Sequence, residues 1–412
     1  MEKLLILGDT FGVKSILAYC KEKHIHTIIT DYHTPERSAN KRLSDEYWMI
    51  SITDLEQLEQ KCREEGVTGV IACTHDLCLD MALELSQRLG LPFYTDAETR
   101  IFERSKDHFK EMCEACGLQV APDYSDLAET PEKIPYPVIV KPIDSSSNRG
   151  QSTCWSAEDF PAAVDYALSF SEKKKIVVEK FLKGEELFVT YTMNKGEIAL
   201  SLLCGVYTNE DQPNRCYSIT CNRSKHLQAY LDKVNDKVVT MLHKMGCEKG
   251  MAFVSCIVED GEFYFLEMGH RLPGGMIQIG FKEISGIDYA KIFTDFSIYG
   301  ESDLPVVAQT GEYEKIACSY IIWAREGTIE KMDGAAELER EGFAVNSFNK
   351  PGCRIFGQTL MNAAVYVVCF SAENNEDFVR KVNRVNDTLV CDDENGNDML
   401  IRFNNFQKVF EK

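Results

Sequence analysis

The first hundred residues alternate short apolar runs with amphipathic helix patterns. Residues 4–7, 26–31 and 69–73 predict strands, whereas residues 55–65 and 77–89 predict helices. Runs that stay apolar without alternation are typical of strands buried on both faces, as in a parallel sheet covered by helices. This alternation therefore constrains the N-terminal part of the chain to βαβ units around an open parallel sheet.

Ligands of such sheets bind beyond the carboxyl ends of the strands. The residues at those ends are Gly8, Asp9, Thr10, Asp31, Thr74, His75 and Asp76. We therefore expect Gly8, Asp9, Thr74 and His75 to contact substrate. His75 and Asp76 could form a catalytic pair, although polar residues at this place more often cap the next helix.

The glycines at positions 8 and 12 invite a dinucleotide-binding interpretation. That fingerprint needs three glycines in G-x-G-x-x-G, and here positions 10 and 13 are Thr and Val. A tight strand-to-helix turn is therefore the favoured interpretation, and an NAD-dependent oxidoreductase is a weak hypothesis.

The charge balance excludes some classes of partner. The chain has 65 acidic and 45 basic residues and a formal net charge of −20, which argues against nucleic acid or an anionic membrane as the main partner. No apolar run approaches the about 18 residues that span a bilayer. The short apolar run at the N-terminus does not resemble a signal peptide, so we expect a cytoplasmic protein.

The sixteen cysteines are scattered along the chain, and we expect reduced thiols. Cys113 and Cys116 form one close pair within a helix pattern. Without a second pair at a suitable distance, buried small hydrophobes are favoured over a zinc or redox site.

A strand pattern at 136–142 ends on Lys141 and is followed by a small, polar loop at 143–152. Backbone amides of such a loop can approach a polyphosphate closely. Because Lys141 adds a fixed cation beside those amides, the segment favours phosphate binding over an ordinary flexible loop.

A second pattern predicts a hairpin, with strands at 250–258 and 263–267 about an Asp-Gly turn. Glu267 and Arg271 lie at its end, just before Gly274 and Gly275. An acid and an arginine at this place suit metal and phosphate contacts, with a surface salt bridge as the alternative.

The pattern changes at about residues 95 and 305. The sequence predicts a parallel α/β domain at 1–95 and a second domain at 96–305, with a lid subdomain at about 110–185. From 306 to 412, strands at 318–322 and 364–369 and a helix at 375–389 predict a small α+β cap.

Together these segments resemble the ATP-grasp superfamily, which includes D-alanine–D-alanine ligase, biotin carboxylase, carbamoyl phosphate synthase and the L-amino acid ligases. The resemblance covers residues 100–300 directly, and the flanking domains fit the biotin carboxylase and L-amino acid ligase branch. It implies an α/β and α+β protein whose ATP-grasp fold lies between the parallel-sheet domain and the cap.

The resemblance also implies how nucleotide binds. Lys106 matches the first nucleotide lysine, and Lys141 matches the second, which contacts the α- and β-phosphates. The loop at 145–150, with Ser146, Ser147 and Gly150, resembles the mobile phosphate flap. The segment from Glu179 through Lys180 to Leu182 is similar to the hinge whose backbone binds adenine, and Glu186 matches the acid that holds the ribose hydroxyls.

Metal and substrate residues are implied in the same way. Glu267 matches the carboxylate that bridges the magnesium ions, and Arg271 matches the arginine that stabilises the transferring phosphoryl group. Arg271, Gly274 and Gly275 would border an acylphosphate. Arg215 or Arg223 could receive a second carboxylate.

Two positions depart from the pattern of the superfamily. Ser255 stands twelve residues before Glu267, where an acid or amide is usual, and Gly269 stands where Asn is usual. We expect the Ser255 hydroxyl to assist Glu267 in binding Mg²⁺, on the argument that an even separation of twelve through a tight turn can return both side chains to one face.

The resulting hypothesis is an ADP-forming ligase that uses ATP and Mg²⁺ to join a small carboxylate, such as an amino acid, to an amine through an acylphosphate. The alternative is a non-catalytic ATP- or ADP-binding metabolite sensor, motivated by Ser255 and Gly269. The sequence does not name the acid or the amine, and bicarbonate stays open as the acid. Oligomeric state also stays open, with a homodimer as a common outcome for soluble enzymes.

Overall fold

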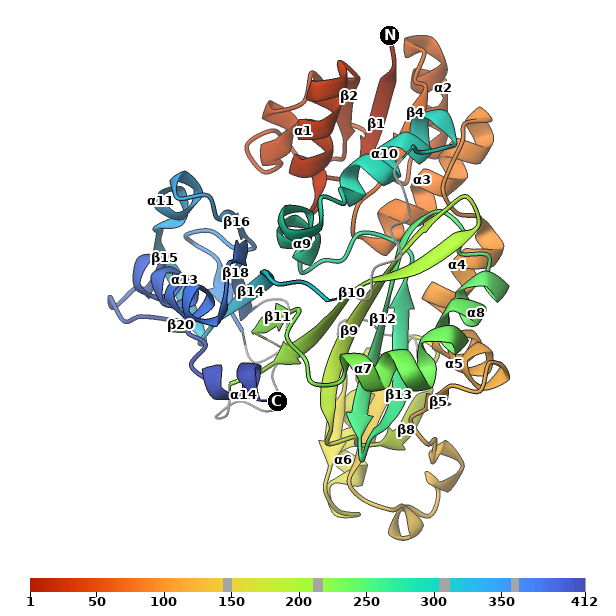
Figure 1. Cartoon of the computed structure of the whole chain (residues 1–412), viewed down its shortest axis with the longest axis vertical. Coiled ribbons are helices and arrows are strands. Elements are labelled where there is room, and N and C mark those ends of the chain that lie inside the picture. Colours follow the sequence, from red (N-terminus) through yellow and green to blue (C-terminus); the bar gives the residue numbers. More distant parts are fainter. Residues whose placement is uncertain (144–149, 210–217, 304–311, 357–362, 412) are drawn as a thin grey trace.

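The computed structural model describes residues 1–411 apart from 144–149, 210–217, 304–311 and 357–362 (Figure 1). A parallel-sheet unit lies at the N-terminal end, a large sheet runs through the middle, and a small β-sheet unit and a C-terminal unit flank it. No helix in the described part of the chain is long and apolar enough to cross a membrane.

The N-terminal sheet is parallel, in the order β3-β2-β1-β4. Its elements are β1 (Lys3–Leu7), α1 (Val13–Lys23), β2 (His26–Thr30), β3 (Glu46–Trp48), α2 (Leu55–Glu65), β4 (Gly69–Ile71) and α3 (Asp76–Leu89). The predicted βαβ units are therefore confirmed. In this sheet the sequence pattern missed β3, a three-residue edge strand that begins on a charged residue, as protected sheet edges often do.

A helix from much later in the chain completes this unit. Helix α10 (Tyr289–Tyr299) packs against β4 and α1, and Figure 1 shows it beside β1. The contact is close, because a Cβ at Gly69 would lie 2.7 Å from the Ser297 carbonyl oxygen. A parallel sheet needs cover on both faces, and here part of that cover comes from beyond residue 95.

The central sheet has the order β16-β18-β14-β11-β10-β9-β12-β13-β5, with β20 beside β14. Its strands are β5 (Gln119–Val120), β9 (Glu185–Asn194), β10 (Glu197–Tyr207), β11 (Ile219–Cys221), β12 (Gly250–Glu259), β13 (Glu262–Gly269), β14 (Ile316–Ala324), β16 (Ala344–Ser347), β18 (Ala364–Ala372) and β20 (Leu400–Ile401). All described pairings are antiparallel except that of β5 with β13.

One face of β9, β12 and β13 is covered by helices. The helices on or beside this face are α4 (Ala97–Arg104), α5 (Lys106–Ala115), α7 (Leu227–Tyr230) with the π-helical turn 231–235, and α8 (Asp236–Lys244). Leu187, Val189 and Tyr191 alternate along β9 into a shared core with these helices. Glu186 and Phe188, which flank Leu187, consequently lie on the opposite face.

The hairpin of β12 and β13 is confirmed, with Asp260 and Gly261 both at positive φ, as a two-residue turn of this kind requires. The pairing then shifts by one residue, so that Cys256 faces Phe265 whereas Ser255 faces Glu267. Leu266 is left as a bulge residue. Without this bulge, Ser255 would pair with Leu266 and Glu267 would lie on the other face.

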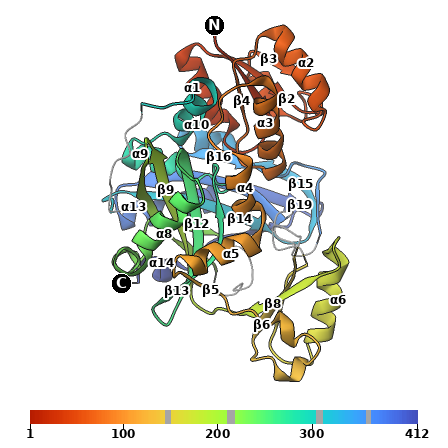
Figure 2. The same cartoon turned by 90° about the vertical axis from the view of Figure 1, so that its right-hand side faces the viewer.

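A separate small sheet has the order β7-β6-β8 and packs on one helix. Its elements are β6 (Val138–Pro142), β7 (Ser152–Cys154), α6 (Phe160–Phe170) and β8 (Ile176–Lys180), preceded by the short 3-10 turns 125–127 and 131–133. In Figure 2 this unit stands away from the main body, as the lid subdomain of the sequence hypothesis would.

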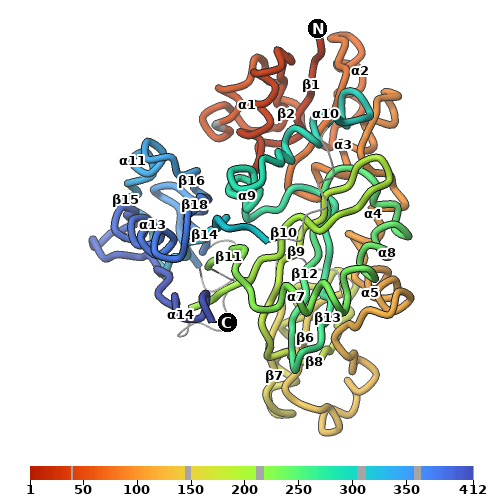
Figure 3. The backbone as a smooth tube through the Cα atoms, viewed as in Figure 1, coloured from red at the N-terminus to blue at the C-terminus, as the bar shows by residue number. Residues whose placement is uncertain are grey.

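The C-terminal unit is joined to the central sheet by the pairing of β11 with β14. Its other elements are α9 (Ile277–Ser285), which packs on β14 and β18, β15 (Gly327–Asp333), α11 (Ala335–Arg340), β17 (Arg354–Ile355), α13 (Asn375–Thr388), β19 (Val390–Asp393) and α14 (Phe406–Phe410). The predicted α+β character is confirmed, and the path in Figure 3 shows this unit beside β10 and β11.

Candidate functional site

A cluster of lysines around one buried carboxylate lies between α5 and the small sheet. Glu179 on β8 accepts hydrogen bonds from Lys110 on α5 and from Lys141 on β6. The ammonium group of Lys106, at the first turn of α5, lies close enough to act electrostatically on Lys141. The structure therefore brings together Lys106, Lys141 and Glu179. Glu179 takes part through its buried carboxylate, whereas the sequence predicts a hinge that binds adenine through its backbone.

The electrostatics of this cluster favour an added anion. Burial lowers the pKa of Lys141, with Lys106 and Lys110 adding to the effect and Glu179 opposing it. Burial alone would raise the pKa of Glu179, but Lys141 and Lys110 hold it below its usual range. Glu179, together with Asp123 at 3.9 Å from the Lys110 ammonium, thus faces three nearby cations, and a phosphate group would supply further negative charge.

The segment that follows β8 has most of its backbone already bonded. The Lys180 N–H donates to the Pro122 carbonyl and the Phe181 N–H to the Pro137 carbonyl, both within the small-sheet unit. The Lys180 side chain binds Glu259 and lies 5.7 Å from the Tyr264 ring centroid. In the described part of the chain the Leu182 N–H has no partner, so it is free to donate to a ligand.

Three predicted residues share the face of the central sheet that the helices leave uncovered. Ser255 on β12 pairs with Phe188 on β9 and with Glu267 on β13, and Glu186 lies two residues before Phe188. Burial raises the pKa of Glu186 to about 7, and the nearby Glu267 carboxylate adds to the increase. Two carboxylates this close together make a local field that favours a cation.

Arg271 lies beyond the end of β13 and stacks on an aromatic pair. Its guanidinium carbon is 5.3 Å from the Phe253 ring centroid, and Phe253 in turn stacks on Phe188 with the ring centroids 4.9 Å apart. A Cβ at Gly269 would overlap the Phe253 ring. The glycine that replaces the usual asparagine therefore leaves room for this aromatic platform.

The loop after Arg271 leads to the N-terminus of α9. Gly274 is exposed, with no atom within 4 Å of where its Cβ would be. The Gly275 carbonyl accepts a hydrogen bond from Ser319 on β14. This loop is therefore open at Gly274 and fixed to the central sheet at Gly275.

In the N-terminal crevice the predicted contact residues have mainly structural partners. The Asp9 carboxylate accepts hydrogen bonds from Ser38, at 2.9 Å, and from the backbone N–H of Asn40, at 3.1 Å. A Cβ at Gly8 would lie 2.8 Å from the Cys78 sulfur, so Gly8 allows a close turn against α3. His75 precedes α3 and is exposed, and its side chain makes no capping bond.

Thr74, the fourth crevice candidate, is half-buried at the end of β4. Three other candidates, Ser146, Ser147 and Arg215, lie outside the described residues. Gly150, at φ +76°, has Pro142 and Phe170 close to the position of a Cβ. Arg223 donates to the backbone carbonyls of Asn222, Tyr313 and Glu314, so it fixes a loop instead of facing an open site.

Sequence reasoning missed two residues of the site. Lys110 lies four residues after Lys106, and this spacing on one face of a helix could have identified it. Asp76 was weighed as a catalytic partner of His75, but its carboxylate accepts a hydrogen bond from the Nε of Arg271 at 3.1 Å. The two residues lie 195 positions apart, and no local pattern could have paired them.

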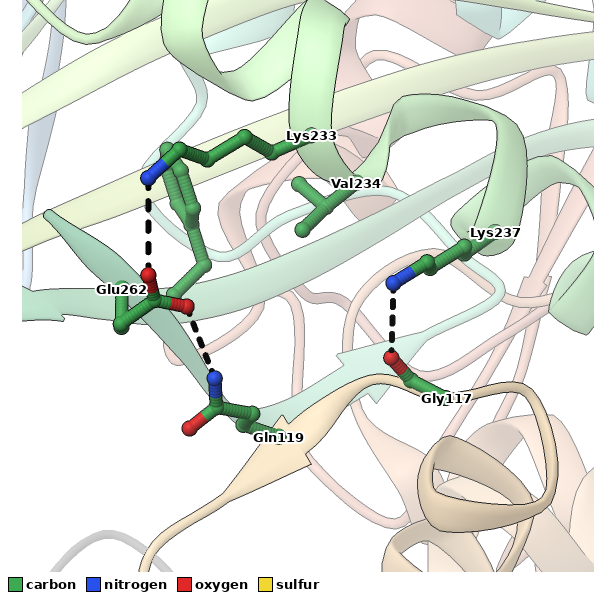
Figure 4. A pocket seen from close by; sticks show the side chains of 7 residues that line it. Gly117, Gln119, Lys233, Val234, Lys237 and Glu262 are labelled. Atoms are coloured by element: carbon green, nitrogen blue, oxygen red, sulfur yellow. Dashed lines mark hydrogen bonds and ion pairs between the residues drawn. The ribbon is translucent and has the colours of Figure 1, made fainter.

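Two pockets lie apart from these residues. One of about 230 Å³ is lined by Gly117, Gln119, Lys233, Val234, Lys237, Glu262 and Phe263. In Figure 4 its polar groups pair among themselves, Glu262 with Lys233 and Gln119, and Lys237 with the Gly117 carbonyl. These bonds tie α8 and the preceding turn to β5 and β13, which indicates a structural role.

The second pocket, of about 570 Å³, lies between residues 183–185, the hairpin turn 258–261 and Lys408. Its Glu185 carboxylate is paired with Lys225 at 2.7 Å and His226 at 3.1 Å. Neither pocket includes a residue of the predicted site.

No group of three or more His, Cys, Asp or Glu residues in the described part of the chain is arranged to hold a metal ion. Cys113 is buried and contacts the Met241 sulfur at 3.5 Å, as expected for a cysteine used as a small hydrophobe. A magnesium ion near Glu267 would therefore need phosphate and water oxygens to complete its ligands.

Comparison with known proteins agrees with this geometry. Residues 119–294 match the family described as D-ala D-ala ligase C-terminus. The formate-dependent phosphoribosylglycinamide formyltransferase of Prochlorococcus marinus is 25% identical over 365 residues, which cover 85% of this chain and 89% of that protein. The enzyme of the same description from Bacillus velezensis is 21% identical over 241 residues, 55% of this chain and 62% of that protein.

Among solved structures, the L-amino acid ligase from Bacillus licheniformis superposes with a TM-score of 0.76 at 18% identity, covering 96% of this chain and 99% of that one. At such identity the likeness concerns the fold. Residues 119–294 therefore resemble the C-terminal domain of D-alanine–D-alanine ligase, and the chain as a whole has the fold of the L-amino acid ligase.

Proposed function

We propose that this protein is an ATP-dependent, ADP-forming ligase that joins a small carboxylate to an amine through an acylphosphate. The observation that carries the proposal is the presence of two groups of charged residues in one fold. A buried lysine cluster around Glu179 lies beside the hinge, and Glu267 and Arg271 lie at the end of a neighbouring sheet. The first suits a polyphosphate, and the second suits the group that is transferred.

ATP supplies a phosphoryl group that turns a carboxylate, which is a poor acyl donor, into one with phosphate as a leaving group. Lys141 and Lys106 would bind the phosphates, and the Leu182 backbone would bind the base. Arg271 would neutralise the charge that develops on the transferred group, beside the open loop at Gly274. These residues act through position and charge, with no covalent step on the protein.

The residues on the sheet face also fit Mg²⁺. Glu267 offers an exposed carboxylate, Ser255 lies opposite it across the strands, and Glu186 adds negative potential. Mg²⁺ commonly takes one or two carboxylates together with phosphate and water oxygens, so a site with Ser255 in place of an acid is compatible with it.

The test combines nucleotide binding with turnover. Calorimetry with ATP and Mg²⁺ should show binding, and Lys141→Ala should weaken it by about 10- to 100-fold, because a charge-assisted contact is lost. Lys244→Ala, at the exposed end of α8, is the control and should bind like the native protein. An unchanged affinity in Lys141→Ala would contradict this placement of the site.

Release of ADP is then measured over pairs of acids and amines. The named relatives suggest formate and L-amino acids as acids, and phosphoribosylglycinamide and L-amino acids as amines; bicarbonate completes the set. ADP release that requires both an acid and an amine supports the ligase. Tight ATP binding with no ADP release on any pair would contradict it and indicate the metabolite sensor.

We place the protein in the cytoplasm, because all its described cysteines are free thiols. Its partners under this proposal are small molecules. A homodimer remains a prediction, which sedimentation or light scattering would test.

A further inference from the structure

The guanidinium of Arg271 is fixed on three sides. Its Nε donates to Asp76 Oδ1 at 3.1 Å, its Nη1 donates to the Leu272 carbonyl at 3.1 Å, and its plane lies over the Phe253 ring. The Arg271 side chain is 19% exposed. Among the described residues the Arg271 Nη2 has no partner, so its N–H groups stay available to bind an anion.

The carboxylate that fixes Arg271 belongs to a different unit of the fold. Asp76 is the first residue of α3, at the carboxyl end of the parallel sheet, whereas Arg271 follows β13 of the central sheet. The contact therefore joins the N-terminal crevice to the end of the hairpin that carries Glu267.

Asp76 is itself held in place by further charges. Arg100 Nη2 lies 3.7 Å from Asp76 Oδ1 and Arg104 Nη1 lies 3.9 Å from Asp76 Oδ2. Arg100 is 3% exposed and is anchored by Asp80 at 2.6 Å and Glu103 at 2.7 Å. A buried arginine with two carboxylates has little freedom, so the position of Asp76 is well determined.

Glu103 extends this support to the other side of Arg271. Its carboxylate accepts a hydrogen bond from the backbone N–H of His270 at 2.8 Å, and the His270 side chain is fully buried and bonded to the Lys249 carbonyl. Arg100 and Glu103 thus hold both neighbours of the Arg271 guanidinium. Glu103 binds the backbone of His270, and Arg100 lies beside Asp76, which accepts the hydrogen bond from Nε.

We propose that Asp76 is a positioning residue for Arg271, which turns the free Nη2 edge toward the group that is transferred. The inference rests on the proposed function, because it gives Arg271 a phosphoryl group to face. The single bond from Nε to Asp76 leaves Arg271 its charge and its Nη2, whereas a bidentate pair of Asp76 with Nε and Nη2 would have occupied that nitrogen.

The same helix offers a matched control. Asp80 lies one turn after Asp76 and shares Arg100 and Arg104 with it, but it has no contact with Arg271 in the described structure. Asp76→Asn and Asp80→Asn therefore remove the same charge from the same arginine network. Only Asp76→Asn alters the acceptor of the Arg271 Nε, whereas Asp80→Asn acts on Arg271 only indirectly, through Arg100.

The test measures kcat and KM for ATP in Asp76→Asn, Asp80→Asn, Arg271→Ala and the double variant Asp76→Asn with Arg271→Ala. We expect Asp76→Asn to lower kcat about 10-fold or more with KM for ATP within about 3-fold, because one charge-assisted bond is lost. Asp80→Asn should keep kcat within about 3-fold. The double variant should be no slower than Arg271→Ala, since Asp76 acts only through Arg271.

The inference is overturned if Asp76→Asn and Asp80→Asn have the same kcat, or if the losses from Asp76→Asn and Arg271→Ala multiply. A native protein that turns over no acid and amine pair would contradict the proposed function alone. The affinity for ADP with aluminium fluoride, which mimics the transferring phosphoryl group, is then measured by calorimetry and divided by the affinity for ADP alone. A ratio that falls equally in Asp76→Asn and Arg271→Ala supports the inference, and a ratio unchanged in either variant, or an absence of nucleotide binding, overturns it.

Discussion

At the scale of single residues, two nearby glutamates show how neighbouring charges can shift the pKa of a carboxyl group in opposite directions. Glu179 is buried between Lys110 and Lys141, which lower its pKa. Glu186, seven positions later, is half-buried opposite Glu267, and its pKa is raised to about 7. The difference comes from the neighbours, because burial alone raises the pKa of both carboxyl groups.

Glu186 should make the stability of the protein depend on pH. Between pH 4.5 and about 7 the folded state keeps a proton on Glu186 that the unfolded state has lost. The free energy of unfolding contributed by this group therefore falls as pH rises through that window and is constant above it. The free energy of unfolding of Glu186→Gln, relative to that of the native protein, should therefore increase by up to about 3 kcal/mol between pH 5 and pH 8.

Urea unfolding of both proteins at pH 5, 6, 7 and 8 measures this difference. Glu267→Gln is the matched control, because it removes the charge that adds to the raised pKa of Glu186. The pH range over which the stability changes should then be narrower. A difference between native protein and Glu186→Gln that stays the same at every pH would show that Glu186 ionises normally.

At the scale of elements, the hairpin of β12 and β13 assembles the sheet-face half of the site. Its bulge at Leu266 turns Glu267 toward Ser255, and the absence of a side chain at Gly269 admits the Phe253 ring. Both departures from the superfamily pattern thus belong to one local packing arrangement, in which an aromatic ring supports Arg271.

Gly269→Ala should destabilise the protein by about 1–3 kcal/mol, because its Cβ would overlap the Phe253 ring within a close-packed face. Gly269 does not have a positive φ, so the cost is steric. Gly274→Ala, where no atom lies within 4 Å of the added Cβ, should be nearly neutral. Unfolding in urea gives both values.

A double variant shows whether Phe253 is the cause. In a Phe253→Leu background the cost of Gly269→Ala should shrink, because the smaller side chain leaves space for the methyl group. An equal loss of stability from Gly269→Ala in the native and the Phe253→Leu proteins would show that the added methyl group clashes with a residue other than Phe253.

At the scale of the whole molecule, the central sheet does not stop near residue 305. Strand β11 pairs with β14, and Tyr207, Ile219, Cys221 and Met276 share one hydrophobic core with the C-terminal unit. The limits 1–95, 96–305 and 306–412 remain a proposal about folding units, and the shared core makes the last boundary testable.

A fragment of residues 1–305 should fail to unfold cooperatively, because it exposes the edge of β11 and the apolar face of α9. Thermal unfolding followed by circular dichroism checks this. Producing residues 306–412 as a second chain with the fragment should restore the cooperative transition. A fragment that unfolds cooperatively by itself would establish residues 1–305 as an independent unit.

Much of the fold could be predicted from the sequence, because its signals are local. Apolar runs of four or five residues gave the strands of the parallel sheet, and the Asp-Gly turn gave the hairpin of β12 and β13. Lys141, Glu179 and Glu267 could be placed by their positions at strand ends. The edge strand β3 could not be predicted, since its three residues are too few to show an apolar pattern.

The sequence by itself determined the order of the elements and the chemical groups at their ends, because both depend on neighbouring residues. The tertiary structure alone decided which groups meet. The argument from an even spacing of twelve was wrong for a regular hairpin, in which Glu267 would face away from Ser255, and the bulge at Leu266 corrects the register. Likewise Asp76 meets Arg271 across 195 residues because the start of α3 lies beside the end of β13 in the folded chain. This contact depends on the packing of whole units, so no local sequence pattern indicates it.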